Sequence, residues 1–516
     1  MNPMPGQQKP SRRDFLKLLA LLPGVVAARS LTQLLDNRRL TDAPNVFIFV
    51  FDAWSANHLS IFGYPRATMP NLERFAGHAF VFHNHYSTAT FTVPGTASLL
   101  TGLYPWSHRA MHLGAGGVTR LHQDHNIFAA LEGELSTLGY AQNPFADLFL
   151  YQFEDALKTH LPNGQFSLEK HQLYNLPVIE NDAAAAFAAF DNNILTGGSG
   201  LESSLFIELF YRLGIIRRQA ALRKNYKWLY PKGLPETSEF FLLDQTIDGG
   251  IETLRGLDAP TLAYFHFFPP HGPYSPTKDY MKMFADGWIP PEKPIHSLSQ
   301  MKSSPEAQLV SRLNYDQYLA AWDAELARLL DFLETSGLLN KSIVIFTSDH
   351  GELFERGDIG HNTLLLSDAV VRVPLFVSLP GQKSRKDIHS FTSSVDILPT
   401  VAHLLGMDVP AWSEGKLLPG MGGQEDASRS IFAIDGKLQS AFAPLTRFSI
   451  SLTRAGYKLI NYQYPEFSSY EFYNLAEDPE ELVELYSQSP GIASQMKQEL
   501  MEKIEEVRRS QSNSDR

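Results

Sequence analysis

The chain has 516 residues, of which 44% are hydrophobic and 19% are charged, and its formal net charge is -12. This composition supports one large globular domain with a smaller one beside it and excludes a disordered or fibrous protein. The negative charge argues against wholesale nucleic-acid binding, which needs a basic surface. Because the chain has no cysteine, disulfides, thiolate metal sites and thiol nucleophiles are excluded as well.

The first 28 residues predict an export signal. A twin-arginine segment, 11–17, precedes an apolar run, 18–28, that is too short to span a membrane and ends in small residues. This order favours a bacterial twin-arginine signal over an ordinary basic, amphipathic start. We therefore expect the twin-arginine machinery to export the folded protein across the bacterial cytoplasmic membrane, to the periplasm or beyond. An uncleaved signal would leave it anchored.

Two apolar runs, 45–51 and 342–347, predict strands that are buried on both faces of a parallel sheet. The second run follows an amphipathic helix predicted over 315–333. The first run ends at Asp52, and the second ends at Asp349 and His350. Ligands of open α/β sheets bind at the carboxyl ends of the strands, so a site is expected at this edge.

The middle of the chain, 147–254, interrupts the alternation of strands and helices and predicts an inserted helical cap. Within it, 201–232 has apolar residues at helical spacing, followed by Lys and Arg interleaved with aromatic residues. Two interpretations remain open. The basic residues are the solvated face of the cap, or they form a membrane-surface contact that draws an anionic lipid or polymer to the site.

The pattern changes again near residue 430. Two alternating runs, 448–452 and 457–462, flank a turn at 455–456 and predict a hairpin, and a charged helix is expected over 492–509. The predicted organisation is therefore a catalytic domain over 45–429 and a small antiparallel subdomain with a terminal helix over 430–516.

A candidate nucleophile lies in the segment 91–102, Phe-Thr-Val-Pro-Gly-Thr-Ala-Ser-Leu-Leu-Thr-Gly. Pro94 is placed to open a helix that Gly102 would end, which puts Thr92 at the helix N-terminus, where an anion is favoured. Asp52, Asp349 and His350 suit a divalent metal ion. A hydroxyl bound to such an ion is a stronger nucleophile. Each motif alone has an ordinary explanation as a cap or strand end, and the ordered combination is what indicates a site.

These motifs, in this order, resemble the sulfatase-like branch of the alkaline phosphatase superfamily over nearly all of the chain after the signal. The resemblance rests on Asp52, His58 to Tyr64, Met69 to Leu72, Thr92 to Thr96, Leu100 to Pro105, Pro270 to Tyr274, Thr347 to Glu352, Arg372 to Leu375, Ser394 to Thr400 and Tyr470 to Leu475. It implies an α/β fold with a mostly parallel central sheet flanked by helices, the helical insertion and the small antiparallel C-terminal subdomain.

The resemblance also implies roles for individual residues. Asp52, Asp349 and His350 correspond to ligands of one divalent ion (Mn²⁺, Zn²⁺, Mg²⁺ or Ca²⁺), and Thr92 corresponds to a nucleophile bound to the same ion. His271 matches a histidine that contacts the substrate or protonates the leaving group, and His361 matches a basic residue lining the site. His266 and Asp396 are interpreted as structural. Ala53 replaces the second residue of the family's Asp-Asp pair, which makes Ca²⁺ less favoured.

The departures from the family pattern bear on the substrate. Sulfatases resemble Cys/Ser-x-Pro-Ser-Arg at this loop and oxidise its first residue to formylglycine, which Thr92 cannot become, and Thr96 replaces the arginine. The segment 141–145 lacks two anion-binding side chains of sulfatases. Threonine nucleophiles occur in relatives that transfer phosphoryl groups. We therefore expect hydrolysis of phosphate mono- or diesters, lipid or glycan linked. Sulfate ester hydrolysis, a phospho-headgroup transferase and an inactive binding protein are the alternatives.

Overall fold

The computed structural model describes residues 43–113, 116–168, 205–237, 239–439, 445–488 and 490–514. The predicted export signal, 1–28, lies outside these ranges. None of the helices within them combines the length and the apolar character that a membrane span requires.

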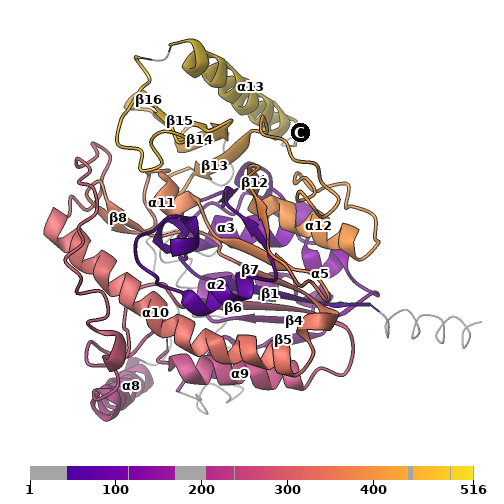
Figure 1. The fold of residues 1–516 in the computed structure, drawn as a ribbon, viewed down its shortest axis with the longest axis vertical. Helices are drawn as coiled ribbons and strands as arrows, with labels where there is room; N and C mark the ends of the chain where they lie inside the picture. The colour runs from indigo at the N-terminus through magenta and orange to yellow at the C-terminus, as the bar shows by residue number, and fades with distance from the viewer. Residues whose placement is uncertain are drawn as a thin grey trace, which may run out of the picture.

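An eight-stranded sheet lies at the centre of the molecule, in the order β11-β2-β10-β7-β1-β6-β4-β5 (Figure 1). Strand β1 pairs in parallel with β6 on one side and β7 on the other, whereas β10 runs antiparallel to β7 and β2. The strands are β1 (Asn45–Phe51), β2 (Phe80–Phe82), β4 (Ser136–Ala141), β5 (Thr159–Leu161), β6 (Thr261–Phe267), β7 (Ser342–Thr347), β10 (Leu375–Ser378) and β11 (Lys386–Ile388). The mostly parallel sheet and its two central strands confirm the prediction.

Alternate residues of β1 point to opposite faces of the sheet. Phe47, Phe49 and Phe51 join an aromatic core with Trp322, whereas Val46 and its alternates join a second core on the other face. The first core lies under α2 (Pro70–Ala76), α9 (Leu243–Arg255) and α10 (Pro305–Thr335), and the second lies under α3 (Thr92–Thr101), α5 (Ile127–Ala130), α6 (Pro144–Gln152) and α12 (Ile397–Leu404) (Figure 1). Burial on both faces explains why the strands read as continuous apolar runs.

Short helices and strands lie around the central sheet. They are β3 (His85–Tyr86), α4 (Pro105–His108), β8 (Leu353–Glu355), β9 (Asp358–Gly360), α11 (Asp368–Val371) and β12 (Thr392–Ser393). Strand β3 pairs in parallel with β12, and β8 pairs with β9 as a hairpin directly after the end of β7.

The expected cap, 147–254, is only partly separate from the sheet. Its first residues continue α6, β5 adds an edge strand to the sheet beside β4, and α9 buries Leu243, Ile247 and Ile251 in the aromatic core. Among the described elements of this region, α8 (Leu205–Tyr226) projects from the body (Figure 1). The proposed boundaries therefore differ from the structure because β5 and α9 are core elements with apolar faces.

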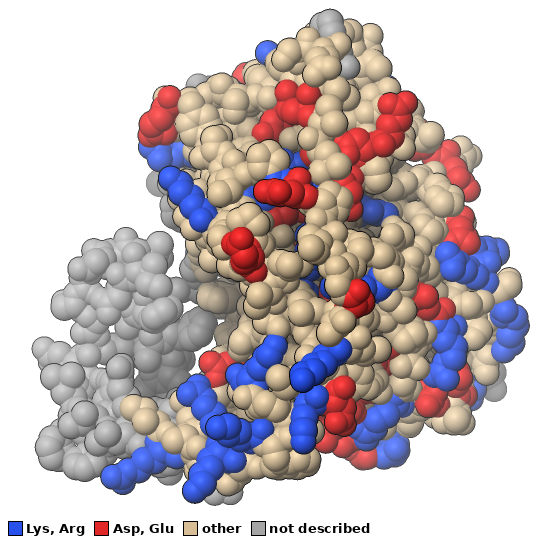
Figure 2. Space-filling view, turned by 60° about the vertical axis from the view of Figure 1, so that its left-hand side comes forward, with Lys and Arg blue, Asp and Glu red and all other residues tan. Residues whose placement is uncertain are grey.

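The second half of α8 and the loop after it present a basic surface. We call the exposed side chains of 216–235 the α8 surface; they include Arg217, Arg218, Arg223, Lys224, Lys227 and Lys232, with no Asp or Glu in that range. Ile216 and Trp228 are 60% and 69% exposed. Figure 2 shows Lys and Arg gathered on the lower part of one face.

A four-stranded antiparallel sheet, β13-β14-β15-β16, forms the C-terminal part with α13 packed on it (Figure 1). These elements are β13 (Ile431–Asp435), β14 (Phe448–Arg454), β15 (Tyr457–Tyr464), β16 (Phe467–Asn474) and α13 (Pro490–Ser514). Ala455 and Gly456, with φ of 51° and 81°, make the turn between β14 and β15. The predicted hairpin and terminal helix are confirmed.

Candidate active site

Three neighbouring strands deliver four polar side chains to one edge of the sheet. Asp52 follows β1, Asp349 and His350 follow β7, and His266 lies near the end of β6. The register pairs Val50 with both His266 and Thr347, so these strand ends lie side by side. We call Asp52, His266, Asp349 and His350 the acidic-histidine cluster, and all four are fully buried.

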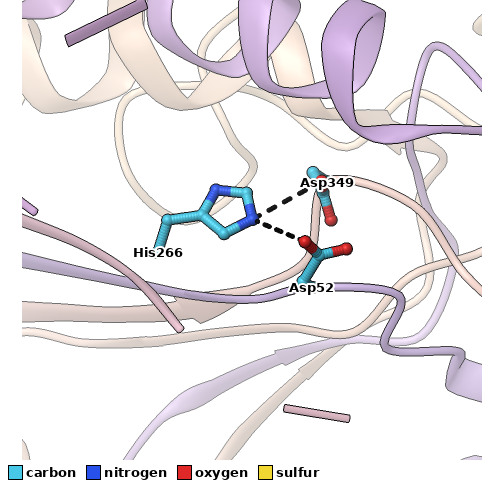
Figure 3. A group of neighbouring side chains, drawn as sticks. All are labelled: Asp52, His266 and Asp349. Atoms are coloured by element: carbon cyan, nitrogen blue, oxygen red, sulfur yellow. Dashed lines mark ion pairs between the residues drawn. The ribbon is translucent and has the colours of Figure 1, made fainter. Parts of the chain in front are cut away.

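Each imidazole of the cluster lies close to both carboxylates. The Nε2 atom of His266 is 3.4 Å from Oδ2 of Asp52 and 3.6 Å from Oδ2 of Asp349 (Figure 3). Similarly, Nε2 of His350 is 3.3 Å from Oδ1 of Asp52 and 3.6 Å from Oδ2 of Asp349. Ligand atoms of Asp52, His266 and Asp349 all lie within 4.8 Å of one another.

Several atoms of the cluster have no hydrogen-bond partner although they are buried. They are Oδ1 of Asp52, Nε2 of His266 and Oδ2 of Asp349. Leaving such groups without a partner is costly, and buried charges are normally paired or bound to metal. The unpaired atoms converge, so the cluster fits a divalent metal ion.

The pKa values follow from the same proximity. Burial opposes ionisation of Asp52, but the neighbouring imidazoles of His271, His266 and His350 lower its pKa well below the ordinary value. Burial and the charge of Asp52 raise the pKa of Asp349. Burial opposes the charge on His350, yet the two carboxylates raise its pKa to about 9. The cluster therefore attracts positive charge strongly.

Thr92 is the first residue of α3, as predicted, and Gly102 ends the helix in the left-handed conformation with φ of 69°. Its Oγ1 lies 3.3 Å from Nε2 of His350. The N-cap residue, Phe91, has no side-chain oxygen, so the N–H groups of the first turn remain for an anion. The structure thus brings the proposed nucleophile to the cluster.

Gly95 allows α3 to approach the end of β7. A β-carbon at this position would overlap the carbonyl oxygen of Asp349. That carbonyl also accepts a hydrogen bond from Ser87 Oγ. The helix N-terminus and Asp349 are therefore in contact through a glycine that admits no side chain.

Asn143 also belongs to the site, although its segment was interpreted only as lacking anion-binding residues. Its Nδ2 is 2.5 Å from Oδ2 of Asp52 and 3.3 Å from Oγ1 of Thr92. Its Oδ1 accepts from the N–H of Phe145, which fixes the amide orientation. The residue follows β4, which adjoins β6, so the strand order could have indicated it.

His271 and His361 lie together beside the cluster. Their ring centroids are 4.6 Å apart, and the ring of His361 is 4.4 Å from that of His350. The Nδ1 atom of His271 donates to the Gly272 carbonyl at 2.6 Å. Burial lowers the pKa of His271, opposed by Asp52, and burial together with His350 lowers that of His361 to about 3. Both rings are therefore held neutral in this environment.

Glu352 contacts the Nδ1 atom of His361. One of its carboxylate oxygens lies 3.2 Å from Nδ1 of His361. Burial raises the pKa of Glu352 to about 7, although His271 and His350 oppose the shift. A neutral His361 donates through Nδ1 to this carboxylate, which leaves Nε2 to face other partners.

A pocket of about 480 Å³ opens onto these residues. Apolar and polar side chains both line it, and among its described lining residues there is no Lys or Arg and one acidic residue, Glu236. The lining residues are Phe91, Thr92, Val93, Leu113, Asn143, Pro144, Phe145, Glu236, Thr237, Phe268, His271, Gly272, Pro273, His361 and Asn362.

Comparison with known proteins agrees with this geometry. Residues 44–407 match the family model described as Sulfatase, and 361–510 match that of the N-sulphoglucosamine sulphohydrolase C-terminal region. The chain belongs to the sulfatase family. Its members and the alkaline phosphatase superfamily relatives are hydrolases of phosphoric or sulfuric esters, and this chain is such a hydrolase.

Relatives of this sulfatase-family chain span both chemistries. The multifunctional alkaline phosphatase superfamily protein PehA of Trinickia caryophylli is 22% identical, over 86% of this chain and 91% of its own. The choline-sulfatase of Rhizobium meliloti is 23% identical, over 88% of this chain and 85% of its own. The phosphonate monoester hydrolase of Agrobacterium radiobacter shares the fold, with a TM-score of 0.61 and 20% identity over 91% and 96% of the two chains.

The sequence interpretation of His266 as a structural residue did not place it beside Asp52 and Asp349. His266 does lie in an apolar strand, but its ring points at Asp52 and Asp349 because it is close to the end of β6 (Figure 3). Asp396 is structural, as expected. It accepts two hydrogen bonds of 2.6 Å from Arg429 and closes a capping box with Ser393.

Proposed function

We propose that this sulfatase-family protein hydrolyses phosphate esters through a covalent intermediate on Thr92. The observation that carries the proposal is the position of Thr92 Oγ1, at a helix N-terminus and 3.3 Å from His350 in the acidic-histidine cluster. Threonine has no route to a formylglycine, and the chain contains no cysteine. A threonine alkoxide attacking phosphorus forms a phosphothreonine, which water can cleave.

One divalent ion, held by Asp52, Asp349, His350 and Thr92, would lower the pKa of the Thr92 hydroxyl and neutralise charge on the substrate. After Thr92 has lost its proton, Oγ1 forms a bond to phosphorus while the bond to the leaving oxygen breaks. Water then attacks phosphorus, and the threonine oxygen is released. Each turnover consumes one ester and one water and yields one alcohol and one phosphate.

His271 is suited to move the protons. Its Nδ1 is occupied by the Gly272 carbonyl, so Nε2 is the atom that remains for the reacting groups. The lowered pKa of His271 keeps Nε2 free of a proton at neutral pH. We assign Nε2 the task of accepting the proton of Thr92 and passing it to the leaving oxygen, and then of accepting a proton from the attacking water and returning it to Thr92 Oγ1.

Asn143 and His361 stabilise the transferred group in this proposal. Nδ2 of Asn143 lies 3.3 Å from Thr92 Oγ1, within reach of an oxygen on a phosphorus bonded to that atom. His361 offers Nε2, since its Nδ1 faces Glu352. Oriented donors that meet charge developing in the transition state contribute strongly to catalysis.

The pocket favours an apolar organic group on the ester. Phe91, Phe145 and Phe268 form walls beside the reacting atoms, and its described lining residues bring no cationic side chain that would suit a polyanionic substrate. The α8 surface lies next to this pocket, because Arg223 pairs with the lining residue Glu236 at 3.2 Å. We propose that the α8 surface binds an anionic lipid surface and that the substrate is a lipid-linked phosphate ester.

Sulfate esters are the second candidate, because the family model that matches is that of sulfatases. We also propose export by the twin-arginine route, on the pattern of 11–28. Neither proposal changes the roles assigned to Thr92 and His271.

The test compares aryl phosphate, aryl phosphodiester and aryl sulfate as substrates of the metal-loaded protein, its Thr92→Ala variant and its Thr92→Ser variant. We expect phosphoester cleavage to dominate, to fall by about 10³-fold or more in Thr92→Ala and to persist in Thr92→Ser. Rapid acid quench and mass spectrometry should find a phosphoryl group on Thr92. Dominant sulfate cleavage, or wild-type activity in Thr92→Ala, would contradict the proposal.

A further inference from the structure

The acidic-histidine cluster contains one nitrogen donor, His266, in addition to the metal ligands that the sequence motifs predicted. His266 comes from β6, and its ring is fully buried. Its Nδ1 lies 3.0 Å from the hydroxyl of Tyr264, which can hold that atom as an N–H donor. The other ring atom, Nε2, then carries a lone pair, has no hydrogen-bond partner and faces Asp52 and Asp349.

The residue after Asp52 supplies no ligand. Ala53 has only a methyl side chain, and its backbone has φ of 60° with the N–H directed to Oδ1 of Asp349 at 3.4 Å. The described donors around the cluster are therefore two carboxylates, two imidazoles and the Thr92 hydroxyl. This set is poor in oxygen for Ca²⁺, which takes 6 to 8 oxygen ligands, and rich in nitrogen for Mg²⁺.

The spacing of the donors also fits one shared ion. Two ligands of a tetrahedral zinc ion, each about 2.0–2.1 Å from the metal, lie about 3.3–3.4 Å apart. His266 and His350 lie 3.3 to 3.6 Å from the carboxylate oxygens of Asp52 and Asp349. Thr92 Oγ1 is 3.3 Å from His350. These separations match those of atoms that share one ion.

We infer that His266 is a metal ligand that replaces the oxygen donor missing at Ala53, and that it makes the site selective for Zn²⁺-type ions over Ca²⁺. Imidazole nitrogen suits zinc and other late divalent ions, whereas Ca²⁺ prefers oxygen. With His266 included, two carboxylates and two imidazoles surround the ion, and Thr92 completes the set. The proposed preference for Zn²⁺ over Ca²⁺ depends on the position of His266 near the end of β6.

The experiment measures metal binding by the full chain without substrate. The protein is freed of metal with a chelator, and its affinities for Zn²⁺ and Ca²⁺ are measured by competition with chromophoric chelators. We expect one Zn²⁺ per chain, bound at least about 10³-fold more tightly than Ca²⁺. His266→Ala should weaken Zn²⁺ binding by about 100-fold or more.

The matched control is His108→Asn, since His108 is also fully buried and contacts Ser98 at 3.0 Å rather than the cluster. It should keep Zn²⁺ affinity unchanged. Circular dichroism of the metal-free variants checks that they fold. Unchanged Zn²⁺ affinity in folded His266→Ala, or tighter binding of Ca²⁺ than of Zn²⁺ by the wild type, would overturn the inference.

A second measurement does not depend on the folding of any variant. Pulsed electron paramagnetic resonance of the wild-type protein loaded with Mn²⁺ should show two coordinated imidazole nitrogens, from His266 and His350. A single coordinated nitrogen would contradict a ligand set that contains both His266 and His350. Because neither measurement involves turnover, failure of the phosphate-ester proposal would leave this result unaffected.

Discussion

The side-chain nitrogen of Asn143 lies 3.3 Å from the hydroxyl oxygen of Thr92, and the orientation of the amide is held by the N–H of Phe145. A donor with a fixed orientation can hydrogen-bond to an oxygen of the phosphoryl group that is transferred to Thr92. Asn143→Ala should therefore lower kcat for phosphoester cleavage by about 10²- to 10³-fold. Half-buried Asn84, which donates to the His389 carbonyl, provides the control Asn84→Ala.

Steady-state kinetics with an aryl phosphate distinguish transition-state stabilisation from simple binding. A fall in kcat with KM unchanged is expected for Asn143→Ala. If kcat stayed at the wild-type value and only KM rose, Asn143 would be a ground-state binding residue instead.

Gly95→Ala should move the N-terminus of α3 away from Asp349. The added methyl group would overlap the Asp349 carbonyl oxygen, which is backbone and has little freedom to shift. We expect kcat to fall by about 10²-fold, because misplacement of a nucleophile by about 1 Å has that effect. Gly491→Ala, where a β-carbon meets no atom within 4 Å, should keep wild-type activity. Equal activities of the two variants would show that the contact of Gly95 with Asp349 does not position Thr92.

The buried carboxyl group of Asp435 should make a pH-dependent contribution to the free energy of unfolding. It is 1% exposed, one carboxylate oxygen accepts from Thr90 Oγ1 at 3.0 Å, and the other has no partner. Burial raises its pKa to about 6, partly opposed by Lys437. Since the unfolded value is about 3.9, the stabilisation is complete below about pH 4 and is lost as the pH rises to about 6.

The comparison is with Asp435→Asn, which cannot ionise. As the pH rises from about 4 to about 7, the unfolding free energy of the wild type should fall by about 3 kcal/mol relative to that variant. Urea unfolding at each pH measures the difference. A pH-independent difference would mean that Asp435 ionises as easily in the folded protein as in the unfolded chain.

The α8 surface should bind anionic vesicles. Arg218→Glu with Lys227→Glu removes two exposed cations without touching the pair of Arg223 with Glu236. We expect partitioning to phosphatidylglycerol vesicles to weaken by at least about tenfold, since each basic residue near such a surface contributes about 1 kcal/mol. The matched variant carries Lys341→Glu and Lys383→Glu, which are exposed residues away from α8.

Vesicle sedimentation reports the result, with phosphatidylcholine as the neutral reference. Binding of the wild type to anionic and neutral vesicles alike, or equal losses in both double variants, would show that the α8 surface does not recognise anionic lipid. Binding to dextran sulfate without binding to vesicles would indicate a soluble polyanion as the partner.

The parts of this site that could be predicted lie where the chain leaves a buried strand. Asp52 and Asp349 end continuous apolar runs, and parallel strands bring their carboxyl ends to one edge. The helix at Thr92 could also be predicted, because Pro94 and Gly102 mark its ends. These signals are local, so a single sequence contains them.

The positions of His266 and Asn143 in the site could not be predicted from such local signals. In a strand buried on both faces, an apolar run does not show which residue lies nearest the edge, and His266 reads as one more core position. Asn143 depends on β4 lying next to β6, which is a matter of strand order. Likewise, β5 and α9 look like parts of an insertion until their packing against the sheet is known.

Asp52 and Asp349 are brought together only by the pairing of β1 with β7, and more than half of the 516 residues separate them in the chain. The other donors join through β6 and α3. No early portion of the growing polypeptide can capture the ion. Uptake of a metal ion must therefore follow completion of the central sheet, late in folding.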